Sequence, residues 1–195
     1  KIKYNKNGPI KPPIVNKTNN LLFFYEGFNY KHECLNEADL FLKGYIKLFN
    51  NKIYKTRTDI NWHKDYELNK DFDNKILHWS KVKIFEDTDI KRIWDLSRWN
   101  WAPLLARAFI LSRNRKYIDL LNKIITSWCN ENPINKGINW SDGQETSIRL
   151  INALITFDII EQFSNCKISE DKINFIKIHL DRIKQTYFYE KSQQN

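Results

Sequence analysis

The feature that most constrains the fold is a series of apolar stripes at helical spacing, which begins near residue 87 and continues almost to the last residue. The clearest stripe occupies one face of a helix and consists of Tyr117, Leu121, Ile124, Ile125 and Trp128. This helix should end at Asn132-Pro133, because a residue that precedes proline is disfavoured in helical backbone. The stripe therefore predicts an amphipathic helix with one buried face.

Four more helices follow from the same reasoning. Their starts are marked by Asp87-Thr88-Asp89, Pro103, Asp142 and Ser169, which are residue types that cap or open helices. Their inward faces are predicted to carry Ile90, Ile93, Trp94 and Ser97; Leu104, Leu105, Ala108 and Phe109; Ile148, Ile151, Ile155 and Ile159; and Ile173, Ile176, Leu180, Ile183 and Tyr187.

Helices joined by short connections pack as antiparallel hairpins, so the sequence predicts an all-α fold. Hairpins without a repeat signature suit either an α/α toroid or an irregular bundle, and the helical period does not choose between them. Residues 1–35 are predicted to form an extended arm or linker, because residues 1–20 are basic and rich in Asn and Pro. The helical domain would then span residues 36–195.

Two local predictions complete this outline. The first helix should start at Asn36, and residues 50–84 should wrap over the body as loops and short strands, because they are aromatic and charged with little helical period. The side of the first helix that turns inward is predicted to carry Ala38, Leu42, Tyr45 and Ile46.

The composition fits one domain with a substantial core, since the chain has 195 residues and 42% of them are hydrophobic. No apolar run approaches the roughly 20 residues of a membrane-spanning helix, so no membrane span is predicted. The net charge of +9 comes mainly from lysine, without an arginine-rich run. Because nucleic-acid readers depend on arginine for bidentate contacts, nucleic acid is not a predicted partner. A solvated surface and a surface for polyanions both stay open.

The spacing of cysteine and histidine predicts neither a metal site nor a cofactor. Cys34, Cys129 and Cys166 show no CxxC spacing, and an odd number cannot pair completely within one chain, so buried free thiols are expected. The four histidines are scattered, and the sequence contains no HExxH, GxSxG, P-loop or dinucleotide motif. A start at Lys1 and the absence of Met lead us to expect a processing site or another boundary before Lys1.

An ordered set of short motifs between residues 59 and 152 resembles one family. The set reads Asp59-Ile60-Asn61-Trp62-His63, His78-Trp79, Ile93-Trp94-Asp95-Leu96-Ser97-Arg98, Ala106-Arg107-Ala108-Phe109, Tyr117, Asn132-Pro133, Gly137-Ile138-Asn139-Trp140, Glu145 and Ile148-Arg149. It is similar to the N-terminal helical domain of the heparinase II/III-like polysaccharide lyases, in which NP, a short gap, G-[VI]-N-W and E-x-x-x-R follow one another. The chain departs from this pattern at Asp95, where Glu is usual, and at Trp99-Asn100-Trp101, which replaces a more polar segment.

The resemblance implies an incomplete α/α toroid, a β-sandwich domain downstream of this sequence, and a periplasmic or secreted protein. It also implies β-elimination on an acidic, uronate-containing polysaccharide. In that reaction a neutralised carboxylate makes the C5 proton removable, a Tyr or His takes the proton, and a Tyr protonates the leaving oxygen. The neutralising Asn of the family precedes a His, and Asn195 is predicted to be that Asn or its neighbour, with the acid/base residues beyond it.

Five other residues are candidates for substrate binding: Arg98, Asn139, Trp140, Glu145 and Arg149. Trp140 beside a Gly-hinged loop could stack on the apolar face of a pyranose or could plug the core under the loop. Asn139 could bind substrate or bond the backbone of its own turn. Arg98 could hold a carboxylate bidentately or pair with a nearby acid.

Glu145 and Arg149 could instead have structural roles. They are four residues apart on one helix face, which permits a salt bridge, and Glu145 lies three residues after Asp142, which is the spacing of a capping box. If the functional readings hold, Asn139, Trp140 and Arg98 should line one concavity with Asn195 near its rim. Two other functions stay open. One is an α/α-toroid glycoside hydrolase that uses paired carboxylates, and the other is a non-catalytic helical domain that binds acidic glycans.

Overall fold

A computed structural model describes residues 28–48, 51–56, 59–72, 75–83, 89–164 and 170–192. The longer helices of this part are α2 (Phe28–Leu42), α4 (Trp101–Ser112), α5 (Arg115–Glu131), α6 (Gly143–Ser164) and α7 (Glu170–Ser192). Shorter elements are α3 (Lys91–Ser97), the 3-10 helices η2 (Trp79–Lys81) and η3 (Ile138–Trp140), and the strands β1 (Tyr45–Lys47), β2 (Ile53–Lys55), β3 (Lys64–Asp65) and β4 (Lys70–Asp71). The prediction of an all-α fold is confirmed for the described residues, because the strands among them form only two small antiparallel pairs.

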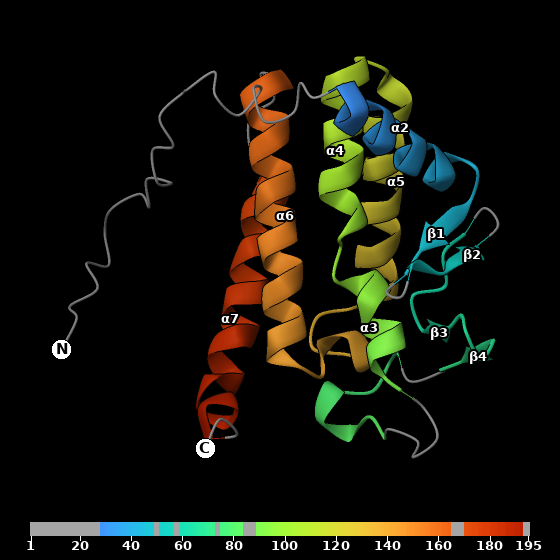
Figure 1. Cartoon of the computed structure of the whole chain (residues 1–195). Coiled ribbons are helices and arrows are strands. Elements are labelled where there is room, and N and C mark those ends of the chain that lie inside the picture. Colours follow the sequence, from blue (N-terminus) through green and yellow to red (C-terminus); the bar gives the residue numbers. More distant parts are fainter. Residues whose placement is uncertain are drawn as a thin grey trace, which may run out of the picture.

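The long helices form two layers of antiparallel hairpins. Helix α4 pairs with α5 and helix α6 pairs with α7, while α4 also packs against both α2 and α6. Figure 1 shows that α4 and α6 run in the same direction and that α5 and α7 run in the opposite direction. The result is one layer that contains α2, α4 and α6, with α5 and α7 in a second layer behind it.

Several predicted helix ends are confirmed. Helix α5 ends at Glu131, directly before Asn132-Pro133, and it buries the stripe that contains Tyr117, Leu121, Ile124 and Trp128. The Oδ1 atom of Asp142 accepts a hydrogen bond of 2.9 Å from the backbone N–H of Glu145, which caps the first turn of α6. The segment 50–84 holds β2, β3, β4 and η2 between loops, as its weak helical period predicts.

The first helix differs from its prediction. Helix α2 begins at Phe28, eight residues before Asn36, so part of the predicted arm is helical. The helix ends at Leu42, near Gly44, whose φ of 76° favours glycine. Tyr45 and Ile46 therefore lie in β1 instead of extending the helix. The buried face of α2 consists of Cys34, Ala38 and Phe41.

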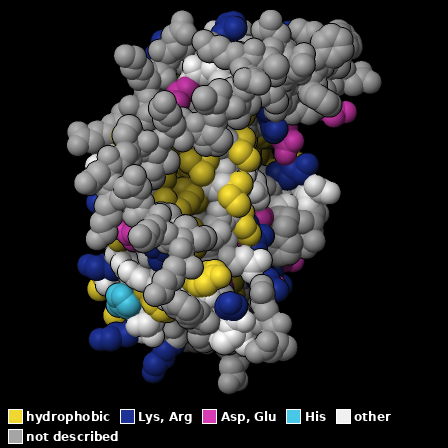
Figure 2. All heavy atoms as spheres, turned by 90° about the vertical axis from the view of Figure 1, so that its left-hand side faces the viewer, with side chains coloured by type: hydrophobic (Ala, Val, Ile, Leu, Met, Phe, Trp, Pro, Cys, Tyr) yellow, Lys and Arg dark blue, Asp and Glu magenta, His cyan; other side chains and the backbone are white. Residues whose placement is uncertain are grey.

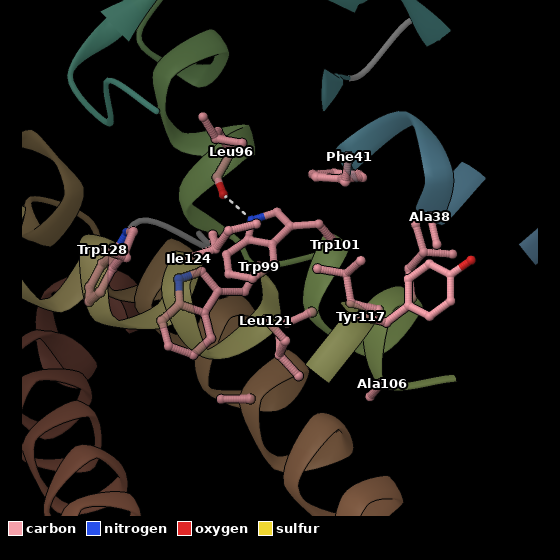
Figure 3. Close-up of a cluster of buried hydrophobic side chains, with 14 of the residues drawn as sticks. Ala38, Phe41, Leu96, Trp99, Trp101, Ala106, Tyr117, Leu121, Ile124 and Trp128 are labelled. Carbon is pink, nitrogen blue, oxygen red and sulfur yellow. Dashed lines mark hydrogen bonds between the residues drawn. The ribbon is translucent and has the colours of Figure 1, made fainter. Parts of the chain in front are cut away.

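The main core is built around tryptophans from the α3–α4 turn and from α5 (Figure 3). Trp99 is fully buried at a φ of 64°, and its ring lies 5.6 Å from Trp101 and 5.4 Å from Trp128, between ring centroids. The indole N–H of Trp101 donates to the Leu96 carbonyl at 3.0 Å, which satisfies a buried donor. These rings join α3, α4 and α5 into one packed unit.

The predicted inward faces of α6 and α7 are wrong at several of their positions. Ile151 and Ile155 of α6 are 55% and 44% exposed, and Ile173, Leu180 and Tyr187 of α7 are also exposed. The reason is that α6 lies between α4 and α7, and the close approach of these helices uses the opposite side of α6. That side carries small or polar residues together with a few apolar ones: Glu145, Thr146, Arg149, Leu150, Ala153, Thr156, Phe157 and Ile160.

Candidate functional site

Several of the segments that carry the family resemblance meet at η3, although they are far apart in sequence. Gly137 has a φ of 74°, which turns the chain so that the following three residues are buried. The amide of Asn139 donates to the Trp62 carbonyl at 2.9 Å and to Asn132 Oδ1 at 2.8 Å. The indole N–H of Trp140 donates to the Asn132 carbonyl at 3.1 Å.

Helix α3 is tied to the same turn by Trp94, whose indole N–H donates to the Ile138 carbonyl at 2.9 Å. We call the following group the motif unit: Trp62, Trp94, Asn132, Asn139 and Trp140, which the bonds around η3 involve, together with the paired residues Arg98 and Glu145 and with Arg149, which lies against the Trp140 ring.

Arg98 and Glu145 form a bidentate ion pair between the end of α3 and the start of α6. The Arg98 Nε and Nη2 atoms each donate to a Glu145 carboxylate oxygen at 2.6 Å, and Arg98 Nη1 lies 3.5 Å from Asp95 Oδ1. The hydrogen bonds from Arg98 to Glu145 raise the pKa of the arginine, against the lowering effect of its partial burial. The pair is the planar, two-bond geometry that arginine makes with carboxylates.

Arg149 is 1% exposed and lies inside the protein. Its Nε donates to His179 Nε2 at 3.0 Å and its Nη1 donates to the Ser97 carbonyl at 3.3 Å. The guanidinium carbon also lies 4.4 Å from the Trp128 ring centroid and 5.1 Å from that of Trp140. Loss of solvation lowers the pKa of Arg149 to about 9, so this arginine still carries its charge at neutral pH.

His179 is a member of this buried network that sequence reasoning missed. Because its Nε2 accepts from Arg149, its Nδ1 carries the proton and donates to the Phe175 carbonyl at 2.8 Å. Burial, followed by the charge of Arg149, lowers the pKa of His179 well below its usual value, so the ring is neutral. Both ring nitrogens are therefore engaged, and this histidine orients Arg149.

Arg182 is a second residue that sequence reasoning missed. Its Nε donates to the Trp140 carbonyl at 2.9 Å and its Nη2 donates to the Ser141 carbonyl at 3.2 Å, so α7 clamps the end of η3. Its guanidinium also lies 4.0 Å from the Trp79 ring centroid. The signal in the sequence was the spacing of His179, Arg182 and Thr186, which share one face of α7 at intervals of three and four residues.

The structure brings five of the six predicted site residues together, but not as a cleft. Asn139, Trp140 and Arg149 are each 1% exposed and Glu145 is also buried, and each of them forms hydrogen bonds inside the protein. Only Arg98 keeps an appreciable exposed fraction of its side chain, 24%. The prediction that Asn139, Trp140 and Arg98 line one shared concavity is therefore wrong. Asn195 lies outside the described residues.

A groove between α5 and α7 lies beside the motif unit. It encloses about 430 Å³ and we call it the α5/α7 groove. Buried residues that line it are Trp128, Asn132, Trp140 and His179, and the remaining lining residues are Cys129, Pro133 and Ile134 from one side and Asn174, Phe175 and Ile178 from the other. Neither Asn139 nor Arg98 belongs to this lining.

The described residues hold neither a metal-binding cluster nor a membrane-spanning helix. Among them, no group of three or more His, Cys, Asp or Glu side chains is arranged to hold a metal ion. In the same part of the chain, every helix is too short or too polar to cross a bilayer. Asp95, Asp142 and Glu145, the acids considered for glycosidase chemistry, serve here in ion pairs or in the cap of α6.

Comparisons of the chain with protein-family models, with curated proteins and with solved structures find no match. The resemblance to the heparinase II/III-like lyases therefore rests on the motif residues themselves and stays a prediction.

Proposed function

We propose that this chain is the N-terminal helical part of a polysaccharide lyase of the heparinase II/III-like kind, acting by β-elimination on an anionic, uronate-containing glycan. In this proposal the described residues build the scaffold of the enzyme, and the acid/base residues belong to sequence beyond Asn195. By analogy with the family, the protein would work in the periplasm or after secretion.

The observation that carries the proposal is the motif unit. Its members were selected from sequence alone, yet segments up to 77 residues apart bond to one another, as Asn139 does to Trp62. A chance collection of short motifs has no reason to converge on one turn. Convergence is expected when the motifs together maintain one architecture, and the resemblance to the family concerns that architecture.

The packing of the hairpins is compatible with the start of an α/α toroid. In a toroid, successive hairpins stand side by side, with parallel inner helices and parallel outer helices. The pairs α4/α5 and α6/α7 follow this order. The side of α6 and α7 that faces away from α4 exposes Ile151, Ile155 and Leu180. Figure 2 views the molecule from this side and shows apolar side chains in its middle. A further hairpin of a toroid would cover such a surface.

The experiment is an elimination assay on the full-length product of the gene that encodes this chain. The product would be incubated with alginate, heparan sulfate and other uronate-containing glycans, and ultraviolet absorbance would report the unsaturated uronate. Turnover of at least one glycan is expected, together with a His shortly after Asn195 and a Tyr further along. A gene without these residues, or no elimination across the panel, would overturn the lyase proposal.

A second candidate, a domain that binds acidic glycans without cleaving them, is favoured by one specific observation. The carboxylate of Glu145 and both ring nitrogens of His179, which contacts the motif unit through Arg149, already have internal partners. For this candidate, binding should weaken steeply with salt, because charges are screened over about 8 Å at physiological ionic strength. Acidic polysaccharide should also displace the bound ligand better than DNA of equal charge, while the absorbance assay stays silent.

A further inference from the structure

The α5/α7 groove has the size of a ligand pocket and a defined chemical character. Its volume of about 430 Å³ lies within the range of about 300–1,000 Å³ that is typical of small-molecule sites. Trp128, Trp140 and Phe175 contribute aromatic rings to it, and Ile134 and Ile178 contribute aliphatic walls. Trp128 and Trp140 are held rigidly, because both rings pack against Arg149 on the inner side.

The polar atoms of the buried lining residues are already used. Asn132 donates to the Trp128 carbonyl and accepts from Asn139 and Trp140, and both nitrogens of His179 are bonded. Among the described residues that line the groove, none carries a formal charge, since His179 is neutral. The side-chain amide of Asn174 is exposed at the rim and is the polar group best placed to meet a ligand.

From this we infer that the α5/α7 groove binds a neutral, largely apolar ring compound, such as a fused aromatic, with one polar edge toward Asn174. A charged ligand would lose its hydration without gaining an ionic partner. A sugar would bury hydroxyl groups opposite polar atoms that are already bonded, and each unpaired hydroxyl costs free energy. The inference goes beyond the proposed function, because an anionic polysaccharide is not a ligand of this kind.

The test uses the complete chain and the neutral fluorescent probe N-phenyl-1-naphthylamine. Saturable binding to one site is expected. It is followed by the fluorescence that the probe gains in an apolar environment. Cys129 lines the groove and is exposed, so bound probe should slow its alkylation by N-ethylmaleimide, read by peptide mass spectrometry. Absence of saturable binding, or unchanged alkylation of Cys129 at saturation, would overturn the inference.

Matched variants locate the site. Ile134→Asp places a carboxylate on the wall at a residue that is 53% exposed, and affinity should fall at least about tenfold, because the charge would be desolvated by the probe. Ile76→Asp changes a residue of the same type that is 74% exposed and outside the groove, and should bind as the unchanged protein does. If Ile155→Asp abolishes binding instead, the probe occupies the exposed side of α6 and the inference is wrong. Displacement by a neutral monosaccharide would also contradict it.

Discussion

Replacement of Glu145 by Gln tests whether the Arg98–Glu145 pair is structural. The substitution keeps the shape of the side chain but replaces one acceptor oxygen by a donor and removes the charge, so Arg98 keeps at most one bond to a neutral amide oxygen. Its remaining ionic contact is then the longer one to Asp95. Glu145 also supplies the favourable charge that partly offsets the burial of Arg149. The substitution therefore leaves two arginines with less compensation than before.

The expected loss follows from the burial of the pair. Breaking a fully buried ion pair costs about 3–5 kcal/mol, and an exposed pair contributes about 0.2–1 kcal/mol. The side chain of Glu145 is 9% exposed and that of Arg98 is 24% exposed, so the pair belongs near the lower end of the buried range. We expect a loss of about 3 kcal/mol in the free energy of unfolding. For a chain of this length the loss corresponds to roughly 6–12 °C in Tm.

The assay is thermal and urea unfolding followed by circular dichroism, with a matched control. Glu131→Gln removes the same charge from the Lys75–Glu131 pair, in which both side chains are 47% exposed, and should change stability by less than about 1 kcal/mol. Arg98→Met and the double variant complete a cycle, and the double variant should cost less than the sum of the single ones. If Glu145→Gln costs no more than Glu131→Gln, the pair does not hold α3 to α6, and a substrate-binding role for Glu145 regains support.

Three further predictions test the buried network and the orientation of α6. The folded state holds the pKa of His179 well below its value in the unfolded chain. The free energy of unfolding should therefore fall as the pH drops below about 6.5, by up to about 2 kcal/mol at pH 5. Urea titrations at a series of pH values should show a weaker dependence in His179→Gln, and an equal dependence would refute the neutral buried ring. Asn139→Leu should cost about 2–4 kcal/mol by urea unfolding, because the Trp62 carbonyl and Asn132 Oδ1 lose their donor inside the protein. By thermal unfolding, Ile155→Gln should change the stability by less than about 0.5 kcal/mol, whereas Ala153→Gln should be strongly destabilising. The reverse order would mean that the side of α6 with Ile155 is the buried one.

The sequence was most informative where local pattern and packing agree. Helix α5 shows this best, since its stripe and its end before Pro133 both follow from residues in or beside one element. The cap at Asp142 was equally local. The hydrogen bond from Asn139 to Trp62 joins residues 77 positions apart, and no spacing rule contains that information. Likewise, nothing local indicates that Trp99 adopts a φ of 64° to reach the core.

Helices α6 and α7 show why the most apolar face of a helix is not always the buried one. The hydrophobic stripe rule assumes that the inner face is the most apolar face. Here the inner faces carry Arg149, His179 and Arg182, and the two arginines donate to carbonyl oxygens at the end of α3 and at the end of η3. Carbonyls at such ends lack helical partners, so the arginine donors satisfy groups that an apolar stripe would leave unpaired.

The same reasoning separates structure from function in this chain. A polar residue in a short motif can be retained because a buried carbonyl needs its donor, and the motif unit satisfies that condition for Asn139, Trp140 and Arg149. Groups that are fully used inside the protein are poor candidates for contact with substrate. Ligand binding is then better sought at surfaces that leave apolar side chains open to solvent. The exposed apolar side of α6 and α7 is one such surface, and the α5/α7 groove is another, although the groove shares Asn132, Pro133 and Trp140 with the motifs.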